Sequence, residues 1–166
     1  MKTMKQYFAR SVSSLAWLAL LSAPLALGCS DDGIGGGDEL VEFENTGRVC
    51  LLADPQSFAD SPQDFVANQP LTVQVTFDSC LSSSCTRDET AVCEAIADGA
   101  TVAVTSSASY LDTTNSAQGC TDDCQTLSVT CEVAGLPDGD YSVSHGGNTL
   151  SFTIPSSVPT APCDSP

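Results

Sequence analysis

Nine cysteines are the residues of this 166-residue chain with the most evident chemistry. Paired cysteines form disulfides in an oxidising compartment, whereas cysteine thiolates combined with histidines bind zinc or copper. The segments CLSSSC and CTDDC have the close spacing of metal-binding pairs. The chain holds a single histidine, however, which leaves a mixed thiolate–imidazole site with few ligands. The cysteines are Cys29, Cys50, Cys80, Cys85, Cys93, Cys120, Cys124, Cys131 and Cys163.

Any histidine-dependent chemistry has to use His145, in the segment SHGGNT. This segment is typical of a β-hairpin turn, because Gly146 and Gly147 can adopt positive φ. The alternatives are a metal ligand or the base of a triad with Asp140 and a nearby serine, but the GxSxG motif is absent. Phosphate-binding loops and cofactor fingerprints are absent too. We predict a polar turn position for His145, no cofactor and no enzyme activity, and expect His145→Asn to cost under about 1 kcal/mol.

Residues 1–28 have the features of an export signal. Lys2, Lys5 and Arg10 precede the apolar stretch LAWLALLSAPLALG. That stretch is shorter than the about 20 residues that span a bilayer, and no stop-transfer pattern follows it. We therefore predict that residues 1–28 are a cleaved signal peptide.

The end of this segment, LALGC, resembles the lipobox of bacterial lipoproteins, with Ala26 where leucine is commonest. The resemblance implies that Cys29 is lipidated on its sulfur, carries an acyl chain such as palmitate on its amino group, and begins the mature chain. Several acyl chains anchor a protein far more firmly than one, since each buried methylene contributes about 0.8 kcal/mol. Ser30 follows the cysteine and, by the same resemblance, implies the outer membrane. Plain secretion is the alternative.

Lipidation of Cys29 leaves an even number of cysteines. In an exported chain of this size, eight cysteines predict four disulfides, with 105 possible connectivities. An unmodified Cys29 would instead leave an odd thiol. The predicted disulfide cysteines are Cys50, Cys80, Cys85, Cys93, Cys120, Cys124, Cys131 and Cys163.

The predicted mature chain is strongly acidic. All 21 acidic residues but only two of the five basic ones, Arg48 and Arg87, lie beyond residue 28, which gives a side-chain net charge of −19. Nucleic acids and anionic lipid headgroups are excluded as partners, because both require clustered Lys and Arg. Solubility in salty surroundings is the plain interpretation. Attraction of divalent cations or basic proteins is the alternative.

Three regions follow the signal. Residues 29–44 combine glycine with acidic residues, which predicts a flexible tether; a calcium loop in GIGGGD is the alternative. Residues 45–158 alternate apolar and polar residues with the period of half-buried strands, and Asp98-Gly99 marks a further hairpin. Residues 159–166 form a Pro-rich tail that Cys163 would pin to the domain. The expected strands are RVCLLAD, LTVQVTF, ETAVCEAIA, ATVAVTSS, TLSVTCEV, YSVS and TLSFTI.

These patterns predict an all-β fold, an Ig-like antiparallel β-sandwich of about seven strands stabilised by disulfides. The segment GLPDGDYSV resembles a corner common in transthyretin-like and Cna-B-type immunoglobulin-like sandwiches. The resemblance implies that Pro-x-Gly forms a turn and that Tyr141 enters the core at the start of a late strand. It implies no activity.

We predict a non-catalytic, membrane-anchored envelope lipoprotein with a structural or adhesion role, whose partners are the membrane and other envelope or surface proteins. Its surface carries no motif for a defined ligand. The alternatives are a lipoprotein that binds calcium, copper or a small ligand, a disulfide-rich inhibitor, and a hydrolase without a recognised motif.

Overall fold

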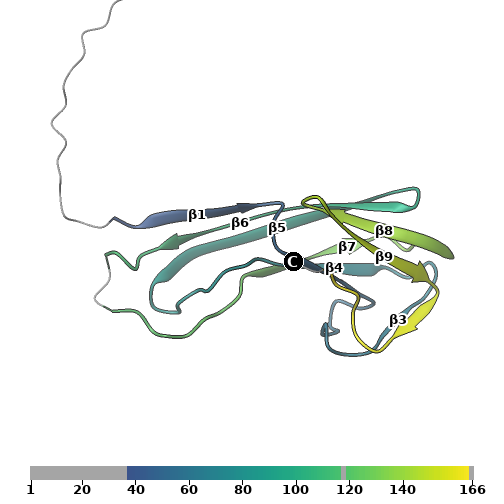
Figure 1. The fold of residues 1–166 in the computed structure, drawn as a ribbon, viewed down its shortest axis with the longest axis horizontal. Helices are drawn as coiled ribbons and strands as arrows, with labels where there is room; N and C mark the ends of the chain where they lie inside the picture. Colours follow the sequence, from purple (N-terminus) through teal and green to yellow (C-terminus); the bar gives the residue numbers. More distant parts are fainter. Residues whose placement is uncertain (1–36, 117–118, 165–166) are drawn as a thin grey trace, which may run out of the picture. The chain divides into compact units, whose positions relative to one another are not determined.

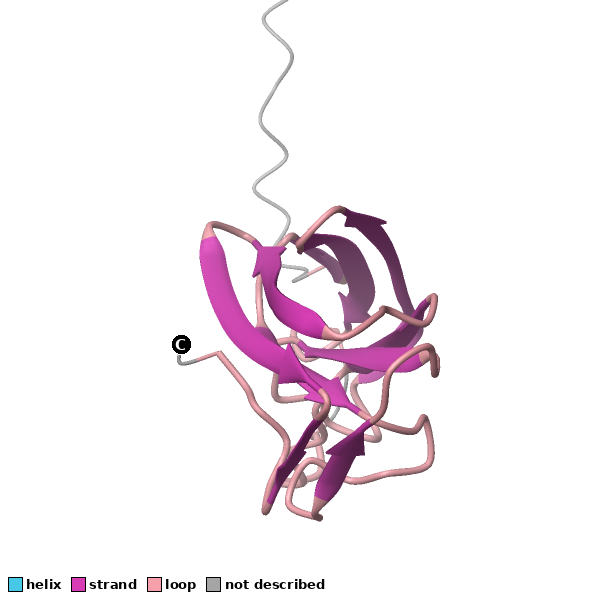
Figure 2. Cartoon of the chain, turned by 90° about the vertical axis from the view of Figure 1, so that its right-hand side faces the viewer, coloured by secondary structure: helices cyan, strands magenta, loops and turns pink. Residues whose placement is uncertain are grey.

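The computed structural model describes residues 37–116 and 119–164, and this part of the chain is all-β (Figure 1). Figure 2 shows strands and loops but no helix over these residues, so none of them forms a helix able to cross a membrane. The strands are β1 (Glu39–Glu44), β2 (Arg48–Leu52), β3 (Gln63–Phe65), β4 (Leu71–Thr76), β5 (Thr86–Asp98), β6 (Thr101–Asp112), β7 (Ser128–Val133), β8 (Gly139–His145), β9 (Asn148–Ile154) and β10 (Ser156–Val158).

A five-stranded sheet is organised around the long strand β6. The strand β5 pairs with β6 along one edge, through the predicted hairpin at Gly99, whose φ is +58°. The other edge of β6 is shared: β1 pairs antiparallel with one end and β8 pairs parallel with the other. The strand β9 then pairs with β8, so β5 and β9 lie at opposite edges of the sheet (Figure 1).

Two smaller sheets complete the described part. The order β2–β4–β7 forms a three-stranded antiparallel sheet, and β10 pairs with β3. The three-stranded and five-stranded sheets contribute alternate residues to one hydrophobic cluster, as the period of two requires. Its most deeply buried members include Leu51, Val73, Val75, Phe77, Val102, Val143 and Ile154.

All seven predicted strands and both predicted hairpins are present, but three strands are additional. The strands β3 and β10 have three residues each, too few to show an alternation. The strand β1 lies inside the predicted tether, so the tether boundary at residue 44 is wrong. Val41 and Phe43 alternate with exposed residues there, and the Phe43 ring lies 5.6 Å from that of Phe77. Residues 1–36, which include the predicted signal peptide, Cys29 and the start of the predicted tether, lie outside the described residues.

The Pro-rich tail is part of the folded domain instead of a loose coil. The backbone of Leu51 donates to Pro162 O at 2.9 Å, and that of Asp164 donates to Val49 O at 2.9 Å. These bonds cover the free edge of β2 with the end of the chain. The disulfide Cys50–Cys163 closes the same contact, as the sequence predicts for Cys163. The composition of the tail did not indicate this packing, because a proline-rich segment can form either a loose coil or the edge of a sheet.

Candidate functional site

The eight predicted cysteines form four disulfides, so they offer no thiolate to a metal ion. The two short segments CLSSSC and CTDDC are not separate clips, because each bonds the other through Cys80–Cys124 and Cys85–Cys120. Cys93–Cys131 joins β5 to β7 and thereby the two larger sheets, with its Cα atoms 5.6 Å apart. Pairing across 35 to 113 residues explains why spacing along the chain could not assign these bonds.

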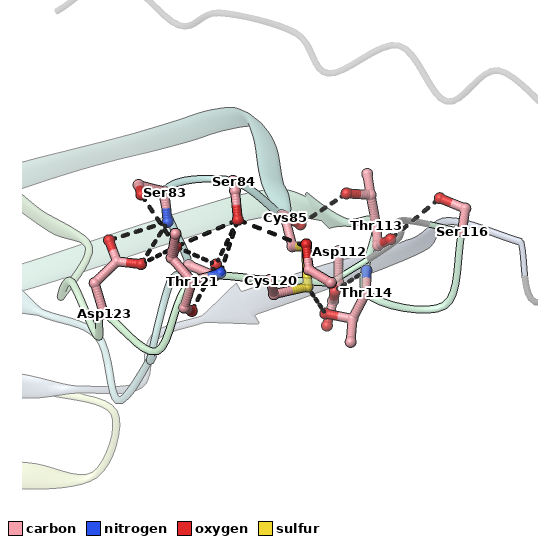
Figure 3. The surroundings of a disulfide bond; sticks show 12 residues. Ser83, Ser84, Cys85, Asp112, Thr113, Thr114, Ser116, Cys120, Thr121 and Asp123 are labelled. Carbon is pink, nitrogen blue, oxygen red and sulfur yellow. Dashed lines mark hydrogen bonds between the residues drawn. A yellow bond between two sulfur atoms is a disulfide. The ribbon is translucent and has the colours of Figure 1, made fainter.

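The paired loops also satisfy their own polar groups (Figure 3). The Ser83 amide donates to both carboxylate oxygens of Asp123, at 3.3 and 3.2 Å, and the Thr121 hydroxyl donates to the same carboxylate. These hydrogen bonds lower the pKa of Asp123, with Thr121 the larger cause. Over the described part of the chain, no three His, Cys, Asp or Glu side chains are grouped closely enough to hold a metal ion. Two disulfides and these hydrogen bonds join the loop between β4 and β5 to the loop between β6 and β7.

His145 is not an exposed turn residue, and that prediction is wrong. It is the last residue of β8 and pairs with Asn148, while Gly146 and Gly147 alone form the turn, with φ of +55° and +89°. The strand alternation of Tyr141 and Val143 continues to His145, so its ring faces the interior and is only 3% exposed.

The imidazole belongs to a buried polar network. Its Nε2 lies 2.8 Å from Ser106 Oγ, on the interior face of β6. Burial lowers the pKa of His145, and the negative charge of Asp164 partly offsets this, so the ring is neutral at neutral pH. Nδ1 has no hydrogen-bond partner among the described residues. The charge-free ring is thus compatible with its apolar surroundings.

Ser106, His145 and Asp164 are the residue types of a hydrolytic triad, but their arrangement is that of a core network. Ser106 is 5% exposed and Asp164 is 8% exposed. The Asp164 carboxylate accepts the Val49 amide at 2.6 Å and the Asn148 side-chain amide at 3.5 Å. It therefore holds the tail against β2 and the β8–β9 hairpin, and the serine hydroxyl is turned away from solvent.

A cavity of about 600 Å³, which we call the end pocket, opens beside His145. Its walls carry both charged and uncharged polar side chains. The walls come from four segments that are far apart in sequence: residues 45–48 between β1 and β2, residues 76–78 at the end of β4, Thr126, and the hairpin residues His145, Gly146 and Asn148.

The rim of the end pocket depends on two close backbone contacts. A Cβ on Gly146 would lie 2.0 Å from Asn45 O, and one on Gly47 would lie 2.5 Å from Thr76 O. Both glycines have positive φ, so the turns they form are matched to this packing. Two hydrogen bonds hold Asn45. Its backbone amide donates to Ser106 O at 2.8 Å, and the backbone amide of Ser106 donates to Asn45 Oδ1 at 3.0 Å. One buried serine thus positions both the β1–β2 turn and His145.

Arg48 and Asp78 give the end pocket its charges. Both are exposed. Arg48 is the first residue of β2 and pairs with Thr76 of β4, and Asp78 lies two residues after Thr76. The other arginine of the predicted mature chain, Arg87, lies on β5 and does not line the pocket. Sequence reasoning missed this pair, because neither residue belongs to a motif. The sequence did contain a signal for Ser106. It lies between Val104 and Ala108, on the side of β6 where the alternating pattern otherwise places apolar residues.

Comparison with known proteins gives no relative for this chain: no protein-family model, no curated protein and no solved structure matches it.

Proposed function

We propose that this chain is an outer-membrane lipoprotein, anchored through Cys29, whose folded part is a non-catalytic interaction module. The anchoring rests on the charged and apolar signal and on the LALGC sequence. A lipid anchor on Cys29 would keep the acidic domain at the envelope, where other envelope or surface proteins are its partners. The four disulfides support it, since such bridges persist in oxidising compartments.

We further propose that the domain is an Ig-like β-sandwich. In support, the three-stranded and five-stranded sheets share one hydrophobic cluster and are linked by Cys93–Cys131. The Tyr141 corner fits as well: the ring stacks on Phe152 at 5.5 Å, and the hydroxyl donates to Pro137 O at 2.9 Å. Gly135 is held against Asn68, whose backbone leaves no room for a Cβ.

The observation that carries the interaction role is the outer face of the five-stranded sheet, the side opposite the core. Val92 and Ile96 of β5 are 62% and 57% exposed there, on either side of the exposed Glu94, and exposed apolar surface is typical of protein interaction sites where it is contiguous. In the strand register they lie beside Ser107 and Ala103 of β6. Rows of hydroxyls continue the face across the sheet, from Thr101, Thr105, Ser107, Ser142, Ser144, Thr149, Ser151 and Thr153.

Photo-crosslinking in intact cells tests this role. A photoreactive amino acid at position 92 or 96 should give discrete adducts to a protein partner, because these side chains would be covered in the complex. Thr130, on the exposed side of β7 in the other sheet, is the matched control position and should give none. Ile96→Ser should weaken the adduct formed from position 92. Equal adducts at all three positions, or none at 92 and 96, would refute the interaction role.

The lipid anchor has a separate test. Cys29→Ser is expected to leave an uncut precursor in the membrane fraction and to abolish incorporation of labelled palmitate, because the sulfur that accepts the lipid is gone. Ser30→Ala keeps the cysteine and should be processed normally. Normal cleavage of Cys29→Ser, with release of soluble protein, would show that the lipobox interpretation is wrong.

A second candidate function is the binding of a small ligand, and the end pocket is the observation that favours it. Its volume of about 600 Å³ is within the range of ligand pockets in proteins. For calcium or copper, no comparable group of ligands is found over residues 37–116 and 119–164.

A further inference from the structure

The end pocket has one positively charged and one negatively charged residue on its walls. Arg48 and Asp78 both line it, and the fully buried Phe77 directly precedes Asp78 in the chain. We propose that this pocket binds a small zwitterion of amino-acid or dipeptide size, with Arg48 on the carboxylate and Asp78 on the ammonium group. This inference rests on the candidate ligand-binding function and not on the interaction role of the outer face.

Arg48 is available for a ligand carboxylate. Among the described residues, no Asp or Glu oxygen lies within ion-pair distance of its guanidinium. An exposed arginine in a chain of net charge −16 would ordinarily find an acidic neighbour, so its position on the wall of a pocket is informative. A guanidinium binds a planar carboxylate with two parallel hydrogen bonds, which gives direction as well as affinity.

Asp78 supplies the complementary end. It lies two residues beyond Thr76, the cross-strand neighbour of Arg48, so the two charges are diagonal neighbours beyond the end of the β2–β4 ladder. A ligand with a carboxylate and an ammonium group on the same carbon atom, or separated by one peptide unit, can contact both.

The charge of the whole chain restricts the ligand class further. The predicted mature chain repels anions and attracts cations without selectivity. A zwitterion has no net charge, so the acidic domain does not repel it. A site with one positive and one negative side chain can bind both of its charged groups. A ligand with a carboxylate and no ammonium group would be attracted by Arg48 alone and repelled by the acidic residues around it.

The pocket is formed before any ligand arrives. Gly47 and Gly146 hold its rim through backbone contacts that no other residue type permits. The ring of His145 is held on one wall by Ser106 at 2.8 Å. A rigid site loses little conformational freedom on binding, which favours affinity for a small molecule with few contacts.

Calorimetric titration of the mature lipoprotein in detergent tests the proposal with four probes: leucine, leucyl-leucine, N-acetyl-leucine and leucine amide. Leucine or leucyl-leucine should bind at least 10-fold more tightly than both capped compounds, since each capped compound lacks one charged end. Arg48→Gln should weaken the zwitterion at least 10-fold, whereas the matched control Arg87→Gln should not. Asp78→Asn should weaken binding of leucine amide but not of N-acetyl-leucine. Thermal melting establishes that each variant is folded.

Two outcomes would overturn the inference in different ways. If a capped compound binds as tightly as the zwitterions and Arg48→Gln still weakens it, the ligand class is wrong but the pocket remains a ligand site. If no probe binds, or if Arg48→Gln and Arg87→Gln behave alike, the candidate ligand-binding function fails together with the inference. Neither result bears on crosslinking from positions 92 and 96.

Discussion

The double replacement Cys50→Ala/Cys163→Ala is expected to lower the free energy of unfolding by about 4 kcal/mol. This bridge spans 113 residues, and the entropy that a cross-link removes from the unfolded chain grows with the length of the closed loop. Chemical denaturation in urea, monitored by circular dichroism, measures the change. Both cysteines are replaced together so that no free thiol remains to form other bridges.

Loss of the same bridge also releases the tail from β2. Val49 and Leu51 would then lose the hydrogen bonds they make with Asp164 and Pro162. The control is Cys85→Ala/Cys120→Ala, whose bridge spans 35 residues and should contribute about 1 kcal/mol less by loop length alone. A smaller effect at Cys50 and Cys163 than at Cys85 and Cys120 would contradict the packed-tail interpretation.

His145→Asn is expected to destabilise the domain by about 2–3 kcal/mol, and not by the under about 1 kcal/mol that a turn position predicts. The ring is 3% exposed, so a smaller side chain leaves a cavity beside the core. Ser106 Oγ would also lose its partner at 2.8 Å while it remains buried. Thr149→Ala, on the exposed face of the same hairpin, is the control and should change stability by under about 0.5 kcal/mol.

The same histidine gives the stability a pH dependence. Burial lowers the pKa of His145 in the folded chain, whereas the unfolded residue takes up a proton below its ordinary pKa of about 6.5. The contribution of His145 is therefore complete above about pH 6.5 and is lost as the pH falls from there toward the folded pKa. The stability difference between wild type and His145→Asn should accordingly shrink between about pH 7.5 and 5.5. A constant difference would mean that the ring is not buried in its neutral form.

The sequence alone determined the local structure of this protein. Alternation with a period of two predicted seven of the ten strands, because each residue of a strand faces the opposite side from its neighbour. The Gly-containing turns at Gly99 and at Gly146 and Gly147 were equally local. The even number of cysteines beyond Cys29 indicated four bridges but left every pairing open.

Only the tertiary structure decided which distant residues meet. Cys50 pairs with Cys163, and Ser106 with His145, because sheet order and register bring β2 to the tail and β6 to β8. The end pocket, with Arg48 and Asp78 on its walls, arises from four segments in the same way. Local patterns carry no such information, because pairing across a sheet depends on the packing of the whole domain and not on spacing along the chain.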